Sequence, residues 1–283
     1  MIRNVSLIVE GGGMRGFYSG GVLKRLLDEG LRFGYVIGIS SGSLCATAYV
    51  GERLDLDFSQ MARGGMLSFV HPRGFVAPRE GILNTSSFIE FLIGRACEPA
   101  LSSPARLLIP ATSAQSGELT WWDQRDCATK DDLHQRVVAS STIPFVMPQT
   151  EVDGRVYADG GIRDSIPLQH AIDDGLHRHV LILSRERGYR KGPQHLELYL
   201  RHVLKPYPRL KDAMLRRHIH YNESIAQVEA AEDAGSAFVF RPRQHRLGRF
   251  EYNPDKFALD FQDGYELAGE LMPRLRAFLG IGA

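Results

Sequence analysis

Residues 5–27 read VSLIVEGGGMRGFYSGGVLKRLL, and this stretch decides the fold. Residues 5–9 are a continuous apolar run that ends before a glycine cluster, which is typical of a buried strand. Residues 17–29 then place apolar side chains at helical spacing and end before Gly30. The stretch therefore predicts a strand, a tight glycine-rich loop and a helix.

The same pattern is repeated in the next segment. Residues 35–39 are a short apolar run, a turn falls at Ser40, and a helix of small residues begins near Ser41. Because parallel strands need a crossover that is usually helical, two consecutive units of this kind predict parallel strands covered by helices. The fold class that we expect is therefore α/β.

The remaining strands and helices are predicted from the same periodicities. Further strands are expected over residues 106–114, 119–122, 156–158, 179–184 and 238–240, and helices over residues 82–97, 130–139, 168–174, 196–234 and 254–279.

No internal repeat or low-complexity linker divides the chain, so we expect a single domain over residues 1–283. Its motif-bearing catalytic part covers residues 5–185, and residues 186–283 form a helical, basic part without a motif. Residues 66–81 contain Gly and Pro and are interpreted as a loop, either a plain connection or a lid beside a site.

Composition narrows the class of protein only slightly. The chain has 34 Lys and Arg against 33 Asp and Glu, so its net charge argues neither for nor against nucleic-acid binding. No stretch approaches the roughly 18 apolar residues of a membrane span, and we expect a cytoplasmic protein. Cys45, Cys97 and Cys127 lack metal-ligand spacing and are expected to be reduced core residues.

A candidate nucleophile lies at the end of the second expected strand. The segment Gly38-Ile39-Ser40-Ser41-Gly42 matches G-x-S-x-G, with its serine at a strand-to-helix turn as in a nucleophile elbow. Gly38 and Gly42 carry no Cβ, so they can flank a sharp turn without colliding with the adjoining strand and helix. Ser40 is therefore the candidate nucleophile.

A serine hydroxyl also needs a base that removes its proton, and the late histidines are poor candidates. His218, His220 and His245 lie among arginines without a local motif, which is typical of a solvated basic surface.

Asp159 is a better candidate for the base. It follows the apolar residues 156–158 and precedes Gly160 and Gly161, so its carboxylate is expected at the carboxyl edge of the sheet, where open parallel sheets place their sites. Asp-Gly-Gly alone is typical of an ordinary turn. The simultaneous presence of Ser40 favours the catalytic interpretation.

The glycine cluster matches G-x-G-x-x-G, the pattern of dinucleotide-binding loops. The residues around it, however, lack the other features of a dinucleotide site. A dinucleotide site needs an Asp or Glu at the end of the second strand, where residues 38–40 stand instead. A phosphate-binding P-loop needs Gly-Lys-Ser/Thr, which is absent after the cluster. We expect the amides of Gly11, Gly12 and Gly13 to stabilise the oxyanion that forms when Ser40 attacks an acyl carbon.

Three separated segments, EGGGMRG (10–16), GISSG (38–42) and ADGG (158–161), resemble the motifs of the patatin-like phospholipase family in order and context. ASSTIP (139–144), followed by Pro148, is similar to the A-S-x-x-x-P segment of that family. The resemblance spans residues 5 to about 185, and its detail is most similar to a bacterial subgroup.

The resemblance implies a three-layer α/β/α sandwich with a mainly parallel central sheet. It also implies a Ser40–Asp159 dyad without histidine and an oxyanion loop formed by Gly11, Gly12 and Gly13. Arg15 stands where the family usually has Arg or Lys, and Gly16 completes the loop motif.

The function implied is a serine lipid acyl hydrolase that acts on a lipid or acyl ester through an acyl-enzyme, without a metal or cofactor. Two alternatives stay open: acyl transfer with the same dyad, and a non-catalytic protein that binds an anionic ligand through the glycine loop. No nucleic-acid partner is expected, because the basic late segment lacks a recognised motif and aromatic platforms. The sequence predicts neither an oligomeric state nor an acyl length or head group.

Peripheral contact with an anionic membrane is a further hypothesis. Its basis is the basic stretches 185–191, 201–217 and 241–249, with Tyr199, Tyr207 and Tyr221 as interfacial residues. A solvated helical face with balancing acids is the alternative.

Overall fold

The computed structural model describes residues 1–54, 85–144, 146–193, 200, 204–244, 247–248, 251 and 253–282. The strands are β1 (Ser6–Val9), β2 (Tyr35–Gly38), β3 (Arg106–Ser113), β4 (Leu119–Asp123), β5 (Thr150–Val152), β6 (Arg155–Asp159), β7 (His179–Ile182) and β8 (Ala237–Phe240). The α-helices are α1 (Gly16–Asp28), α2 (Ser41–Val50), α4 (Thr85–Leu101), α5 (Lys130–Ser141), α6 (Leu168–Asp173), α8 (Pro208–Asp233) and α9 (Pro254–Leu279). The short 3-10 helices are η1 (Gly13–Arg15), η5 (Gln124–Asp126) and η6 (Gly160–Ile162).

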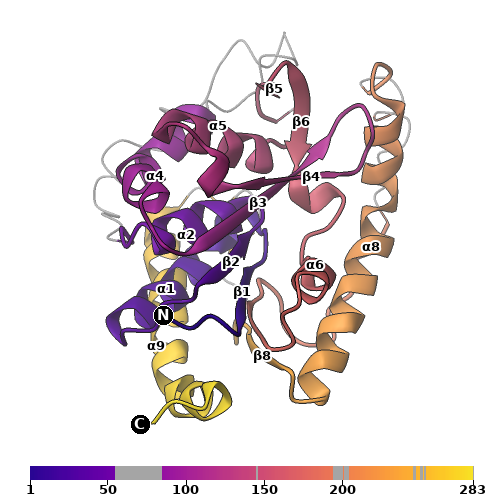
Figure 1. The fold of residues 1–283 in the computed structure, drawn as a ribbon. Coiled ribbons are helices and arrows are strands. Elements are labelled where there is room, and N and C mark those ends of the chain that lie inside the picture. The colour runs from indigo at the N-terminus through magenta and orange to yellow at the C-terminus, as the bar shows by residue number, and fades with distance from the viewer. Residues whose placement is uncertain are drawn as a thin grey trace.

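The strands form one mainly parallel sheet in the order β5-β6-β3-β2-β1-β7-β8, with β4 paired to β3 outside this path (Figure 1). Strand β1 pairs in parallel with β2 and β7, and the parallel pairing extends outward to β3 and β8. Strands β4 and β6 run antiparallel to β3, and β5 runs antiparallel to β6. The expected α/β class with a mainly parallel sheet is confirmed.

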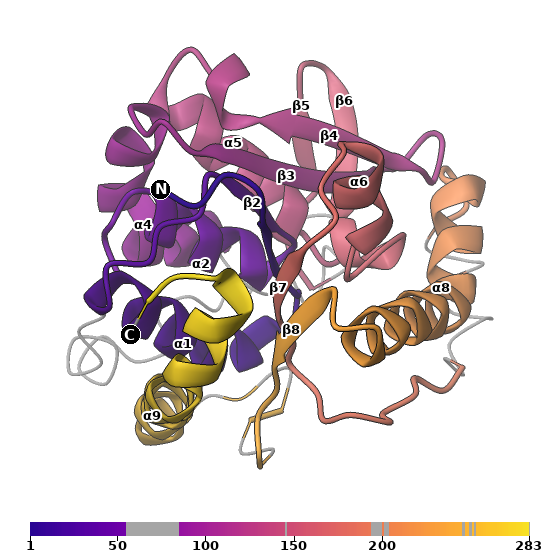
Figure 2. The same cartoon turned by 60° about the horizontal axis from the view of Figure 1, so that its bottom comes forward.

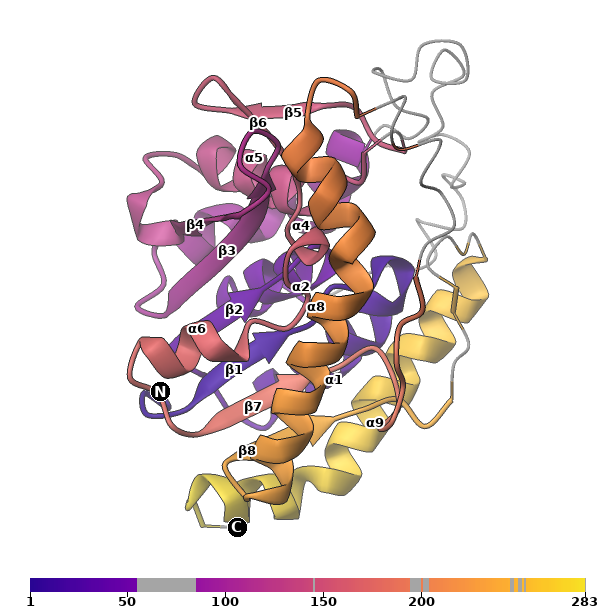
Figure 3. The same ribbon diagram turned by 90° about the vertical axis from the view of Figure 1, so that its right-hand side faces the viewer.

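The helices cover both faces of the sheet, because successive side chains of a buried strand point to opposite faces. Leu7 and Val9 of β1 belong to a buried core shared with α1, α2, α4, α5 and α9. Ile8 belongs to a second core shared with α6 and α8. Figures 2 and 3 show these two helical layers on opposite sides of the strands, which is the expected three-layer α/β/α sandwich.

Two parts of the sequence prediction differ from the structure. The helix expected over residues 196–234 is not continuous: Leu200 is helical, residues 204–206 form a turn, and α8 begins at Pro208. Pro206 and Pro208 disfavour helical backbone in the residues before them. Strand β5 was not expected, although Asp153-Gly154 between β5 and β6 is a hairpin signal: both residues have positive φ, 50° and 70°. Residues 66–81, interpreted as a loop or lid, lie outside the described residues.

The three cysteines are free thiols, as expected; Cys97 is buried in the core, whereas Cys45 and Cys127 are half-buried. Among the described helices, none is long and apolar enough to span a bilayer.

Helices α1 and α9 touch each other through their backbones. A Cβ on Gly21 of α1 would lie 1.9 Å from the carbonyl oxygen of Phe261, and a Cβ on Gly264 of α9 would lie 2.2 Å from the carbonyl oxygen of Tyr18. Because no side chain fits at these distances, glycine on both helices sets their separation. The C-terminal helix is therefore built into the same core as the helix that follows the glycine loop.

We expect Gly21→Ala to lower the free energy of unfolding by about 2 kcal/mol or more, since the added methyl group pushes the two backbones apart. Gly20→Ala in the same helix is the matched control, because its Cβ would meet only the Phe261 ring, at 3.3 Å. Urea unfolding followed by circular dichroism measures both. Equal stability of the two variants would contradict the packing argument.

Candidate active site

Ser40 occupies a strained turn between β2 and α2. Its backbone has φ 55° and ψ −128°, a region that costs a residue with a Cβ about 1–3 kcal/mol. A Cβ on Gly38 would lie 2.5 Å from the Gly42 carbonyl oxygen, and one on Gly42 would lie 2.2 Å from that of Val9. The two glycines therefore permit the close approach that this turn requires.

The carboxyl ends of β2 and β6 meet beside Pro110 of β3. Strand β2 pairs with residues 106–108 of β3 and β6 pairs with residues 111–113, and the two run in opposite directions. The other edge of β3 is occupied by β4, so β2 and β6 share one edge and point at each other. This arrangement brings Ser40 and Asp159 together, although they are far apart in the chain.

The Ser40 hydroxyl donates a hydrogen bond of 2.8 Å to Oδ2 of Asp159. Both side chains are buried, each with 6% of its surface exposed. The other carboxylate oxygen, Oδ1, accepts the N–H of Gly161 at 2.7 Å. The Asp159 backbone is held by the Thr142 carbonyl at 2.7 Å and the Thr112 hydroxyl at 2.9 Å.

The predicted position of Asp159 in the sheet is wrong in one respect. We expect the Asp159 carboxylate at the carboxyl edge of the sheet, where open parallel sheets place their sites, but β6 is antiparallel to β3. The two side chains therefore meet at an interruption within the sheet rather than side by side along its carboxyl edge. A Cβ on Gly160 would lie 2.4 Å from the Pro110 carbonyl oxygen, so the residue after Asp159 needs to be small.

The segment Ala139-Ser140-Ser141-Thr142-Ile143-Pro144 braces this junction. The Ser140 hydroxyl accepts the Ser40 N–H at 3.2 Å and donates to the Pro110 carbonyl at 2.6 Å. It thereby ties the strained turn to β3. The motif was recognised from sequence only as a resemblance, and its contacts were not predicted.

The glycine loop lies directly against Ser40. A Cβ on Gly11 would lie 2.9 Å from the Ser40 Cβ, and one on Gly16 would lie 3.0 Å from the Ser41 Cβ. The Gly12 N–H donates to the Ser41 hydroxyl at 2.9 Å. Gly13 has φ 62° and starts η1, which leads into α1.

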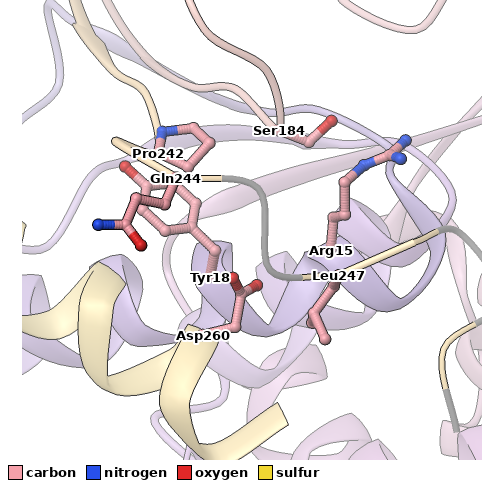
Figure 4. Close-up of a pocket in the computed structure, with 7 residues that line it drawn as sticks. All are labelled: Arg15, Tyr18, Ser184, Pro242, Gln244, Leu247 and Asp260. Carbon is pink, nitrogen blue, oxygen red and sulfur yellow. The ribbon is translucent and has the colours of Figure 1, made fainter. Parts of the chain in front are cut away.

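Arg15 is half-buried and lines a small cavity of about 10 Å³ beside the loop. Figure 4 shows its lining side chains, which come from the loop, α1, α9 and the segments after β7 and β8: Arg15, Tyr18, Ser184, Pro242, Gln244, Leu247 and Asp260. A cavity of this size has room for about one water molecule. The cavity is too small for a lipid head group. It therefore gives no support to a role of Arg15 in attracting the substrate.

Two of the late histidines, His218 and His220, contact groups of their own helix, α8. His218 contacts the Leu215 carbonyl at 3.0 Å, and His220 lies 3.6 Å from the Glu223 carboxylate. His245 lies outside the described residues.

The structure corrects one element of the membrane hypothesis. Tyr221 is only 2% exposed, and the ammonium nitrogen of Lys191 lies over its ring, 3.7 Å from the ring centroid. Tyr221 is therefore not an interfacial residue. Tyr207 is half-buried, and Tyr199 lies outside the described residues.

Many of the arginines in the basic stretches are paired with acids. These pairs are Arg187 with Glu232 and Asp233, Arg190 with Glu229, Arg241 with Glu232, and Arg243 with Glu270. Their charges are partly neutralised within the protein, in line with the alternative of a solvated, balanced face. Membrane contact stays a prediction.

The α/β/α fold and a strained serine turn beside a glycine loop place the chain among α/β proteins with a nucleophile-elbow type of turn. A family model described as patatin-like phospholipase matches residues 7–172, and the chain belongs to this family. A second model, described as a domain of unknown function (DUF6363), matches residues 207–280.

Comparison with individual proteins gives more distant similarities. An uncharacterized NTE family protein of Mycobacterium tuberculosis is 28% identical over 196 residues, which cover 67% of this chain and 51% of that protein. The uncharacterized protein YjjU of Escherichia coli is 27% identical over 190 residues, with coverages of 63% and 51%. The chain thus spans about half the length of these curated relatives. The crystal structure of VipD from Legionella pneumophila aligns with 96% of this chain and 67% of that chain, at a TM-score of 0.49 and 14% identity.

We expect Ser140→Ala to lower the free energy of unfolding by about 1–3 kcal/mol, because it leaves the buried Ser40 N–H and Pro110 carbonyl without partners. Ser141→Ala is the matched control: the Ser141 hydroxyl is equally buried but bonds to no described residue. Chemical unfolding of both variants is the measurement. A Ser141→Ala protein that loses as much stability as Ser140→Ala would contradict the assignment.

Proposed function

We propose that this protein is a serine lipid acyl hydrolase in which Ser40 is the nucleophile and Asp159 the general base. The observation that supports this most directly is the 2.8 Å hydrogen bond from the Ser40 hydroxyl to the Asp159 carboxylate. The strained backbone of Ser40 supports it further, because strain of this kind concentrates at functional sites.

In the first half of the proposed reaction, Ser40 Oγ attacks the carbonyl carbon of an ester and its proton passes to Oδ2 of Asp159. The tetrahedral intermediate then collapses. The bond to the alcohol breaks, the alcohol leaves with the proton from Asp159, and the acyl group stays on Ser40.

In the second half, a water molecule takes the place of the alcohol. Asp159 accepts a proton from the water as its oxygen attacks the acyl carbon, and Ser40 Oγ leaves and takes that proton back. The products are a carboxylic acid and an alcohol, and no electron transfer is involved. In the alternative reaction, acyl transfer, a second alcohol or a thiol replaces the water.

We assign the stabilisation of the oxyanion in both tetrahedral intermediates to the backbone N–H groups of Gly11, Gly12 and Gly13. The contact of this loop with Ser40 supports this role, and neither the Gly11 nor the Gly13 N–H donates to another described residue. The Gly12 N–H is bonded to the Ser41 hydroxyl, so its use requires Ser41 to rotate away. A single such donor typically contributes a factor of about 100–1,000 to the rate.

The substrate class, a lipid ester, comes from membership of the patatin-like phospholipase family.

The test is covalent labelling with a fluorophosphonate, which reacts with activated serines. We expect the wild-type protein to be labelled at Ser40, and Ser40→Ala to lose both labelling and esterase activity. Asp159→Asn keeps a side chain of the same size but cannot take the proton, so its turnover should fall by about 100-fold or more. Ester hydrolysis is measured on medium-chain nitrophenyl esters and on phospholipid vesicles.

Two results would contradict the proposal. One is full esterase activity in Asp159→Asn, because Asp159 would then not be the general base. The other is a wild-type protein that is inert toward both the probe and a panel of esters, which favours a non-catalytic ligand-binding protein.

A further inference from the structure

One face of α8 is directed at the junction of Ser40 and Asp159. Arg217, Tyr221 and Val228 are buried, and they are separated by one or two helical turns, so they lie on the same side of the helix. Neighbouring Arg216 and Ile219 are exposed. This helix belongs to the region that matches the domain of unknown function, outside the patatin-like match.

Arg217 reaches the residues that follow Asp159. Its Nε donates a hydrogen bond of 2.6 Å to the carbonyl oxygen of Gly161, although Gly161 is more than fifty residues away in the chain. The side chain is only 8% exposed. A guanidinium group buried to this degree costs free energy unless it is hydrogen-bonded, so its position is specific.

Both backbone polar groups of Gly161 are hydrogen-bonded. Its carbonyl accepts Arg217 and the Ser165 hydroxyl at 3.0 Å, while its N–H donates to Oδ1 of Asp159 at 2.7 Å. A Cβ on Gly161 would lie 3.1 Å from that carboxylate oxygen and 3.5 Å from Nη2 of Arg217, so the three groups are in close proximity. A shift of Gly161 would change the hydrogen bond that holds the Asp159 carboxylate in the orientation that faces Ser40.

The same helix also approaches the glycine loop. The Tyr221 hydroxyl, one turn after Arg217, is buried, and burial together with the adjacent Glu10 carboxylate raises its pKa. Glu10 directly precedes the loop and accepts the N–H of Ser184 at 2.5 Å. Ser224, on the next turn, donates to Asp164 at 3.0 Å.

The second helix of this region, α9, supports the loop from the other face of the sheet. It meets α1 at Gly21 and Gly264, and Phe257 stacks on Phe17 with ring centroids 4.5 Å apart. Phe17 is the second residue of α1, directly after the loop.

We propose that Arg217 is a positioning residue that orients the Asp159 carboxylate through Gly161, and that residues 207–280 thereby complete the site of the patatin-like part. The catalytic consequence rests on the proposed function of Ser40 and Asp159. The geometric consequence, a fixed turn over residues 159–165, does not.

The experiment compares Arg217→Ala and Arg217→Lys with Arg216→Ala, which removes an exposed arginine from the same helix. We expect the rate constant for fluorophosphonate labelling of Ser40 to fall about 10- to 100-fold in Arg217→Ala, since a hydrogen bond from a charged donor is lost. With a nitrophenyl ester, kcat should fall while KM changes little. Guanidinium at millimolar, non-denaturing concentration should restore part of the rate in Arg217→Ala but not change that of Arg216→Ala.

Hydrogen–deuterium exchange provides the second measurement, and it needs no activity. Amides of residues 159–165 should exchange faster in Arg217→Ala and Arg217→Lys than in wild type or Arg216→Ala, at a temperature where circular dichroism shows each variant folded. If Arg217→Ala is unfolded, the comparison is made on Arg217→Lys, for which we expect the same changes with smaller amplitude.

A folded Arg217 variant with wild-type labelling and wild-type exchange over residues 159–165 would overturn the inference. Faster exchange with an unchanged labelling rate would also overturn it, because the arginine would then be structural only. A wild-type protein that the probe does not label refutes the proposed function instead, and the exchange result then decides whether Arg217 fixes the turn.

Discussion

The structure depends on the meeting of two strand ends beside Pro110. Strands β2 and β6 use the same edge of β3 from opposite directions, so each must stop where the other does. The chain leaves β2 through the left-handed backbone of Ser40 and leaves β6 through Gly160 and Gly161. Gly38, Gly42 and Gly160 allow close approaches at this point, because a Cβ on them would collide with the backbone oxygen atoms of Gly42, Val9 and Pro110 respectively.

The hydrogen bond between Ser40 and Asp159 follows from this geometry. Asp159 is the last residue of β6, and Ser40 lies two residues after the end of β2. Around them, Ser140 bonds to the Ser40 N–H, Thr112 bonds to the Asp159 carbonyl, and the Gly161 N–H bonds to Oδ1 of Asp159. Each of these bonds satisfies a buried polar group that would destabilise the junction if it were left unpaired.

The sequence was informative where the signal is local. Apolar runs, helical spacing and the G-x-S-x-G turn depend on neighbouring residues, and they predicted β1, α1, β2 and the start of α2 to within one residue. The position of Asp159 was predicted as a strand end, but not the antiparallel direction of β6, because strand direction depends on partners distant in the chain. The Asp153-Gly154 pair between β5 and β6 is also a local signal, typical of a hairpin turn.

Arg217 illustrates the other limit. Arg217 is one of several arginines in a basic helix. The residues next to it in the sequence do not indicate that this arginine is buried. The spacing of Arg217, Tyr221, Ile225 and Val228 marks a buried face, but the spacing does not reveal what that face contacts. The structure supplies that contact, and it shows the C-terminal helices packed into the same cores as the patatin-like part.

The central claim is that Ser40 carries the acyl group during the reaction. Its most direct test is to mix the protein with a reactive ester, quench with acid within milliseconds to seconds, and determine the acylated residue by peptide mass spectrometry. The account predicts an acyl adduct on the peptide that contains Ser40, with the adduct decaying as free acid appears. Release of acid at a measurable rate with no adduct on Ser40, or with the adduct on another residue, would contradict it.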